Sequence, residues 1–332
     1  MSIDDVTIAE ARRRIRAAYD PNLLGMAGHK LAELLATHMA RVQASGGRVL
    51  NWEDAQKNIA KATSILAEGD NSAGDNSVDD VDGLAEHFAG LVRTMLDHGH
   101  NLHDPRYLGH QVPAPVPIAG WFDAVGSVTN QVMAIYEMGP WASSVEEAMV
   151  RRLGSLIGFP PGEFAGMVTH GGSLANLTAL LTARNVVLGD VWENGLGIST
   201  EAPKGTETPG TETSTGTPKG TVPFSLRENW DSPRHAPVLV AHAEAHYSVA
   251  RAAGILGLGT RQIVRAELDR LGRIDPERLD RTLRRLRAEN RPIVAVVACS
   301  CATPIGAFDP LQSIAEVCHK HDVWLHVAAA HG

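Results

Sequence analysis

The stretch that decides the fold is Val323-Trp-Leu-His-Val-Ala-Ala-Ala-His-Gly332, at the end of the sequence. Trp324 to Val327, which are apolar except for His326, predict a buried β-strand, because mostly apolar runs are typical of strands covered on both faces. Ligands in α/β sheets bind at the carboxyl ends of parallel strands. We therefore expect the alanines and histidine that follow this strand to form one wall of a ligand site.

The segments before this strand alternate between strand and helix patterns. Val238–His242 and Ile293–Cys299 are continuous apolar strands, and the short apolar run 164–169 is expected to be another. Asp275 and Asp309, each followed by proline, are predicted to cap helices with their carboxylates. This alternation predicts an α/β fold with a mostly parallel sheet covered on both faces.

Two further segments complete the expected organisation. Residues 1–103 are predicted to be a helical amino-terminal segment, because apolar residues recur there at spacings of three and four. Residues 104–332 carry the strand and helix alternation. Within them, 197–223 is rich in Thr, Gly, Pro, Glu and Ser, and we predict a disordered insert there. A linker between two domains is the alternative.

Composition narrows the classes of function. A formal net charge of −8 provides no basic field, so neither nucleic acid nor an anionic membrane is an expected partner. Three cysteines in 332 residues are too few for a disulfide framework, which favours a reducing compartment. The amino end lacks the pattern of a secretion signal, and no run approaches about 18 apolar residues. We expect a cytoplasmic protein that acts on a small molecule.

Three motifs follow predicted strands and could meet at one rim of the sheet. The first, Thr169-His-Gly-Gly-Ser-Leu-Ala-Asn176, precedes a helix, whose free amides and dipole favour a phosphate. The second contains His246, whose flat imidazole could stack on a flat ring. The third contains Thr303, whose hydroxyl could reach a ligand. Each motif is a weak signal alone, and their combination predicts a cofactor site.

In order and spacing, these motifs resemble the fold type I pyridoxal-phosphate (PLP) enzymes, and among them the group II amino acid decarboxylases. These include the aromatic amino acid, glutamate and diaminobutyrate decarboxylases. The resemblance runs from about residue 105 to the end, with Tyr107-Leu-Gly-His-Gln-Val-Pro-Ala-Pro and Tyr136-Glu-Met-Gly-Pro-Trp141 among its motifs. It implies PLP as cofactor, an amino acid as substrate, loss of carbon dioxide as the reaction and a homodimer as the assembly.

The resemblance also implies roles for individual residues. Gly172 and Ser173 would hold the phosphate, and His246 would stack over the pyridine ring. Thr303 would contact the cofactor near its ring, and Ala330 would pack beneath it. Residues expected near the substrate mouth are His110, Gln111 and Tyr136.

Two departures from the family pattern predict weak catalysis. Ala328 occupies the position of the aspartate that keeps the ring nitrogen protonated. The lysine that holds PLP as a Schiff base is expected beyond Gly332, together with a small carboxy-terminal domain, and none of the lysines in this sequence is a credible substitute. We therefore expect little turnover. The alternatives are a non-catalytic fragment or dimer partner of the same fold, and another fold type I activity such as an aminotransferase or desulfurase.

Histidines and cysteines near the end of the sequence raise the question of a metal site. The spacing of His319, His321, His326 and His331 does not match a compact ligand set, so we expect no metal. Cys299 and Cys301 are expected to be inert thiols beside the cofactor site.

Overall fold

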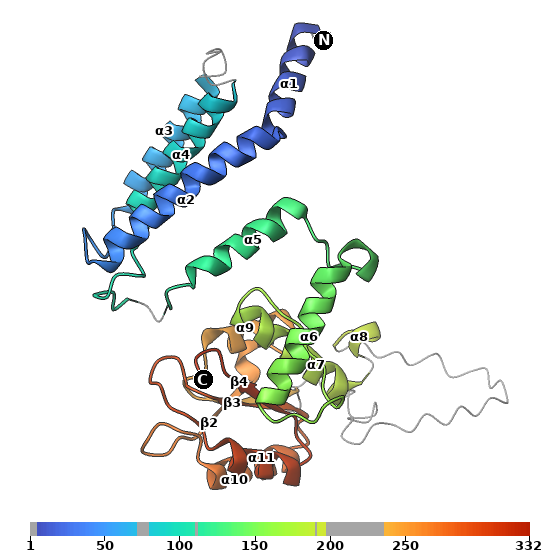
Figure 1. The fold of residues 1–332 in the computed structure, drawn as a ribbon. Coiled ribbons are helices and arrows are strands. Elements are labelled where there is room, and N and C mark those ends of the chain that lie inside the picture. The colour runs from blue at the N-terminus through green and yellow to red at the C-terminus, as the bar shows by residue number, and fades with distance from the viewer. Residues whose placement is uncertain (1–4, 72–79, 110–111, 190, 197–235) are drawn as a thin grey trace, which may run out of the picture. The chain divides into compact units, whose positions relative to one another are not determined.

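The computed structural model describes residues 5–71, 80–109, 112–189, 191–196 and 236–332. Two compact units make up the chain, Met1–Gln131 and Val132–Gly332 (Figure 1). The stretch 197–223, predicted to be a disordered insert, lies outside the described residues.

The first unit is helical in its described part, as the spacing of its apolar residues predicts. Asp20 caps the second helix by accepting a hydrogen bond from the Asn22 amide at 2.8 Å. That helix packs against the fourth, and the buried residues of the two helices are Val42, Ala85 and Ala89. The helices are α1 (Asp5–Ala18), α2 (Pro21–Gln43), α3 (Ala55–Asn71), α4 (Val81–His98) and α5 (Pro117–Thr129).

The second unit contains a sheet of four parallel strands in the order β2-β1-β3-β4 (Figure 1). Its strands are β1 (Val238–His242), β2 (Ile263–Ala266), β3 (Ile293–Cys299) and β4 (Leu325–Ala328). Its helices are η3 (Tyr136–Met138), α6 (Pro140–Leu156), α7 (Gly172–Leu188), α8 (Val191–Asn194), α9 (Tyr247–Ile255), η5 (Thr260–Gln262), α10 (Pro276–Ala288) and α11 (Leu311–Lys320).

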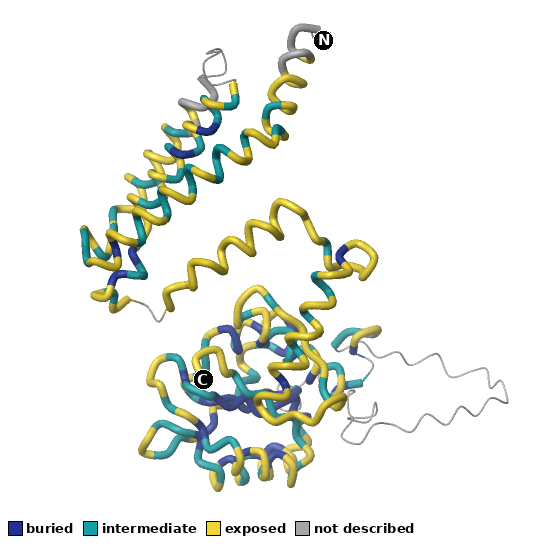
Figure 2. The backbone as a smooth tube through the Cα atoms, in the orientation of Figure 1, coloured by how far each residue is buried: buried dark blue, intermediate teal, exposed yellow. Residues whose placement is uncertain are grey.

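Both faces of this sheet are covered, because successive side chains of a strand point to opposite faces. Leu239 and Val297 face a core shared with α7 and α9. Val240 and Val296 face a second core shared with α10 and α11. The strands β1 and β3 are buried along their whole length and form the dark blue centre of this unit (Figure 2). The predicted α/β fold with a mostly parallel sheet is therefore confirmed.

Several element predictions can be compared with this structure. Strands β1 and β3 have the predicted bounds, and Asp275 caps α10 by accepting from the Arg278 amide at 3.1 Å. The prediction of a strand at 164–169 was wrong, because those residues have no strand partner. The prediction that Asp309 caps a helix was also wrong. Helix α11 has Pro310 at its N-cap position and no side-chain cap.

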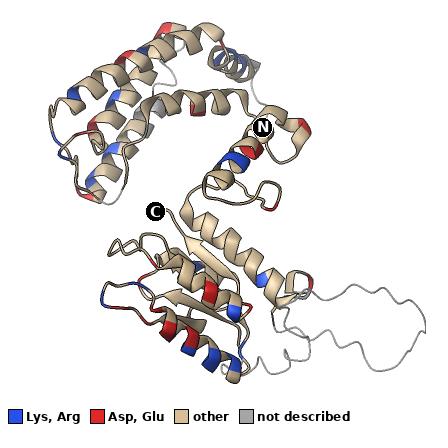
Figure 3. Ribbon diagram, turned by 60° about the horizontal axis from the view of Figure 1, so that its bottom comes forward, with Lys and Arg blue, Asp and Glu red and all other residues tan. Residues whose placement is uncertain are grey.

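Charged residues of both signs mark the described helices (Figure 3). On α10 they form pairs one helical turn apart, such as Arg284 with Asp280 and Arg285 with Glu289. Over the described ranges, none of the helices combines the length and apolar character that crossing a bilayer would need.

Candidate functional site

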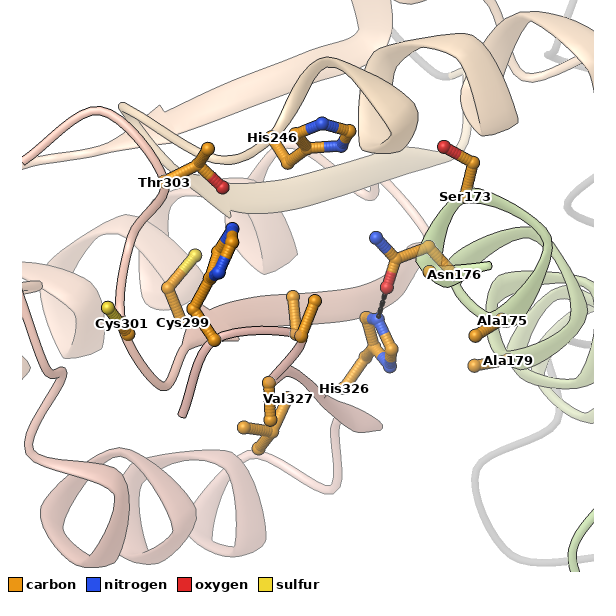
Figure 4. A pocket seen from close by; sticks show the side chains of 15 residues that line it. Ser173, Ala175, Asn176, Ala179, His246, Cys299, Cys301, Thr303, His326 and Val327 are labelled. Carbon is orange, nitrogen blue, oxygen red and sulfur yellow. Dashed lines mark hydrogen bonds between the residues drawn. The ribbon is translucent and has the colours of Figure 1, made fainter. Parts of the chain in front are cut away.

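A pocket of about 520 Å³ lies at the carboxyl ends of β1, β3 and β4 (Figure 4). Helix α7 forms one wall, and the segments that follow the three strands form the others. Its volume is in the range of about 300–1,000 Å³ that is usual for small-molecule sites. The lining residues are Gly172, Ser173, Ala175, Asn176, Ala179, His246, Cys299, Cys301, Thr303, His326, Val327, Ala328, Ala329, Ala330 and His331.

The amino end of α7 enters this pocket through glycines. Gly171 has φ 85° and ψ 159°, a backbone conformation that is essentially restricted to glycine. Gly172 lies against the end of β4, where a Cβ added to it would be 3.5 Å from the Cβ of Ala330. The first turn of a helix leaves amide N–H groups without intrahelical acceptors. This end of α7 can therefore bind an anion, with the Ser173 hydroxyl beside it.

Hydrogen bonds join four pocket and near-pocket side chains from α7, α9 and β4. His326 Nε2 lies 2.8 Å from Asn176 Oδ1, and Asn176 Nδ2 donates to Ser248 Oγ at 2.8 Å. Ser248 Oγ in turn lies 2.8 Å from His246 Nδ1. Burial lowers the pKa of His326, so that its ring is held neutral. These contacts fix the position of His246 relative to α7 and β4.

The loop after β3 carries Cys301 and Thr303 and is anchored by Asp309. The two carboxylate oxygens of Asp309 accept hydrogen bonds from the backbone amides of Ile274 and Cys299, each at 2.7 Å. Burial, with a smaller effect of the Asp309 charge, raises the pKa of the Cys299 thiol to about 12. Cys299 is thus an unreactive thiol on the pocket wall.

The end of β4 forms an apolar side of the pocket. Val327 and three alanines line it, and Ala328 pairs in register with Cys299 of β3. The pocket lining contains histidines, hydroxyls and an amide, but no Asp, Glu or Lys among the described residues. A cationic group of a ligand would find no ion-pair partner there.

The structure brings together six of the residues predicted for the site and leaves others apart. Gly172, Ser173, His246, Thr303, Ala328 and Ala330 all line the pocket. Tyr136, in η3, does not line it and has an exposed side chain. His110 and Gln111 lie outside the described residues.

The predictions did not include two residues of the hydrogen-bonded chain. Asn176 lies one helical turn after Gly172, a spacing that places both on one side of α7 and could have indicated it. Ser248 follows His246 by two residues, and no sequence signal distinguishes it from an ordinary helix-start serine. His321 pairs with Asp280 away from this pocket. The described part of the chain holds no group of three or more His, Cys, Asp or Glu arranged to bind a metal.

Comparison with known proteins identifies relatives of this chain. The family model described as "Pyridoxal-dependent decarboxylase conserved domain" matches residues 229–332. The chain is 32% identical over 203 residues to the Homo sapiens acidic amino acid decarboxylase GADL1, covering 61% of this chain and 32% of that protein. It is 25% identical over 252 residues to the L-2,4-diaminobutyrate decarboxylase of Acinetobacter baumannii, covering 75% and 44%. The chain thus spans less than half the length of these relatives.

Solved structures share the fold. The crystal structure of mouse CSAD matches with a TM-score of 0.67 and 23% identity, over 92% of this chain and 53% of that one. Oryza sativa TDC, solved with PLP and tryptamine, matches with a TM-score of 0.67 and 15% identity, over 93% and 55%. At these identities the structures support the fold type I architecture alone.

Proposed function

We propose, from the relation of this chain to the group II PLP-dependent decarboxylases, that its pocket binds PLP and that its activity is decarboxylation of an L-amino acid. The observation that carries the proposal is the convergence of α7, His246, Thr303 and the end of β4 on one pocket. Motifs that lie far apart in the sequence meet there, as a site for a phosphorylated ring requires.

The residues present fit a phosphorylated flat ring on three sides. The glycine entry of α7 can receive the phosphate, because backbone at Gly171 and Gly172 can approach it closely. The imidazole of His246 and the methyl groups of β4 could enclose the two faces of the ring. The fourth side does not fit, because Ala328 offers no carboxylate to the ring nitrogen.

PLP supplies, when bound, a sink for the electron pair left behind as carbon dioxide departs. We assign Gly172 and Ser173 to phosphate binding and His246 to one face of the ring. Thr303 would place its hydroxyl near the ring, while Ala330 would pack against the other face and Ala328 would lie at the ring nitrogen. Tyr136, His110 and Gln111 remain candidates for the substrate mouth.

Two features support slow turnover by this 332-residue chain. Without a carboxylate at position 328, protonation of the ring nitrogen loses its stabilising partner, and the electron sink is weakened. The described lysines also lie outside the pocket lining, and Lys320 pairs with Asp280 at 2.8 Å. These features favour, as a second candidate, a protein that binds PLP but acts mainly as a partner of a catalytic relative.

Titration of the purified chain with PLP, followed by absorbance, tests the proposal. We expect saturable binding of one PLP per chain and little release of carbon dioxide from labelled amino acids. Ala328→Asp should lower the dissociation constant about tenfold, because a hydrogen bond to a charged group contributes roughly 1.5–3 kcal/mol.

Ala315→Asp is the control for the added carboxylate, since Ala315 is exposed on α11 and lies outside the pocket lining. Failure of the chain to bind PLP would exclude the proposed cofactor. Rapid decarboxylation by the unaltered chain would contradict the expected impairment.

We further propose a cytoplasmic homodimer. The described structure leaves all three cysteines as free thiols, which is consistent with a reducing compartment. Helix α5 has no buried residue and exposes large apolar side chains, which supports a covering partner such as a second copy of the chain.

A further inference from the structure

Four side chains from His326 to His246 are linked by consecutive hydrogen bonds, which we call the hydrogen-bonded chain. One further contact decides which atom is the donor and which the acceptor in each of these bonds. The backbone amide of Ser248 donates to His246 Nδ1 at 3.3 Å, as part of the N-cap of α9. A backbone N–H can only donate, so Nδ1 must be an unprotonated acceptor. The proton of a neutral His246 ring is therefore on Nε2.

The remaining donors and acceptors follow from this one. Because Nδ1 is an acceptor, the hydroxyl of Ser248 must be the donor of the 2.8 Å hydrogen bond between Ser248 Oγ and His246 Nδ1. Ser248 Oγ then accepts from Asn176 Nδ2, which leaves Asn176 Oδ1 to accept from His326 Nε2. His326 must carry a proton on Nε2 as well. Every hydrogen bond of the chain is satisfied in this one arrangement.

The two central members of this hydrogen-bonded chain are also shielded from water, which would otherwise compete for their hydrogen bonds. Ser248 is 1% exposed and Asn176 is 9% exposed. The three elements that it connects are α7, α9 and β4. Residues of α7 and β4 line the pocket, and α9 begins directly after the lining residue His246. A proton on His246 Nδ1 would leave both of its donors, the hydroxyl and the backbone amide of Ser248, without their acceptor.

We infer that His326, Asn176 and Ser248 hold His246 as the neutral tautomer with its proton on Nε2, and that Asn176 and Ser248 are positioning residues for this ring. The pocket thus presents a neutral imidazole with Nε2–H as its remaining donor. A neutral ring adds no positive charge beside a cofactor, and Nε2–H could donate to a substrate carboxylate. The donation from Nε2–H to a substrate rests on the proposed function. The position of the proton on the His246 ring does not, because it follows from the hydrogen bonds within the protein alone.

Nitrogen NMR of the full chain with ¹⁵N-labelled histidine, without added PLP and near pH 7.5, tests the inference. Comparison with His246→Gln assigns the signals of His246. We expect a pyridine-like Nδ1 and a proton-bearing Nε2. A proton on Nδ1, alone or together with one on Nε2, would overturn the inference.

Asn176→Asp tests the direction of the chain with almost no change in shape. A carboxylate can accept from His326 but cannot donate to Ser248, so the Ser248 hydroxyl turns toward it and leaves His246. We expect the Nδ1 signal of His246 to shift toward the protonated form and the PLP dissociation constant to rise about three- to tenfold. Unchanged signals in a folded Asn176→Asp protein would show that the chain does not position His246.

Two further variants complete the design. Ser248→Ala removes one of the two donors to His246 Nδ1, and we expect the Nδ1 signal to shift toward the protonated form here too. This variant provides the test if Asn176→Asp does not fold. Thr178→Val is the control, because the Thr178 hydroxyl donates only to the Leu174 carbonyl of its own helix at 2.9 Å. It should leave the His246 signals unchanged. If the unaltered chain fails to bind PLP, the proposed function fails, while the spectra still decide the tautomer.

Discussion

Asp309 joins two segments that lie far apart in the sequence, by accepting the amide protons of Ile274 and Cys299. Its side chain is fully buried, so Asp309→Ala would leave two amides without acceptors and without water. We expect the free energy of unfolding to fall by about 2–4 kcal/mol, measured by urea denaturation. Asp275→Ala, which removes a half-buried helix cap, should cost only about 1 kcal/mol. Equal losses in the two variants would contradict this role of Asp309.

The pKa of His326, which burial lowers from 6.5, makes stability depend on pH. The unfolded chain binds this proton at a higher pH than the folded chain does. At high pH the ring is neutral in both states, so His326 does not change the free energy of unfolding there. As pH falls below about 6.5, protonation favours unfolding and the free energy of unfolding decreases. We expect a smaller decrease between pH 7.5 and 5.5 in His326→Gln, by urea denaturation. The exposed His319→Gln variant should keep the full decrease.

Asp309 and Asn176 show why residues are harder to predict than elements. Asp275-Pro276 and Asp309-Pro310 have the same local pattern, and only the first acts as a helix cap. The difference comes from burial. Both carboxylate oxygens of Asp309 already accept hydrogen bonds from buried backbone amides, so the carboxylate does not cap the helix that follows it. Asn176 likewise depends on Ser248 and His326, which reach it only once the sheet has formed. The glycines and His246 could be predicted only from the motifs in combination, because each motif is a weak signal alone.

At the level of elements, the entry of α7 depends on Gly171. Its φ of 85° with ψ of 159° disfavours any side chain, although a Cβ would meet no atom within 4 Å. We expect Gly171→Ala to lower the free energy of unfolding by about 1–3 kcal/mol through backbone strain, and to weaken PLP binding. Gly254→Ala, inside α9, is the matched control and should cause no loss, because glycine is the poorer helix former. Normal stability of Gly171→Ala would show that another backbone conformation is available there.

The strands show what an apolar run can and cannot predict. Strands β1 and β3 are buried on both faces, so hydrophobic burial alone selects them and their bounds could be predicted. Residues 164–169 are as apolar but find no strand edge in the described structure, and Met167 and Val168 stay exposed. Strand β2 has the opposite character. It is short, carries an exposed Arg265 and forms because β1 offers an edge, which periodicity alone does not reveal.

At the level of the whole molecule, helix α5 is an element of the described structure with exposed apolar side chains and no buried residue, and it is yellow throughout Figure 2. Its apolar residues recur at the three- and four-residue spacing of a single helix face. Their exposed fractions run from 40% for Trp121 to 77% for Phe122. The residues of this face are Ile118, Trp121, Phe122, Val125 and Val128.

A homodimer that covers this face would bury these side chains, each contributing in proportion to the apolar area removed from water. Phe122→Glu combined with Val125→Glu should therefore shift the protein from dimer to monomer in sedimentation velocity, because burying a charge without a partner is costly. Ser127→Glu adds one negative charge on the opposite face of α5 and should leave the dimer intact. A monomeric unaltered chain at micromolar concentration would contradict the proposed assembly. Dissociation by Ser127→Glu would instead show that another face of α5 makes the contact.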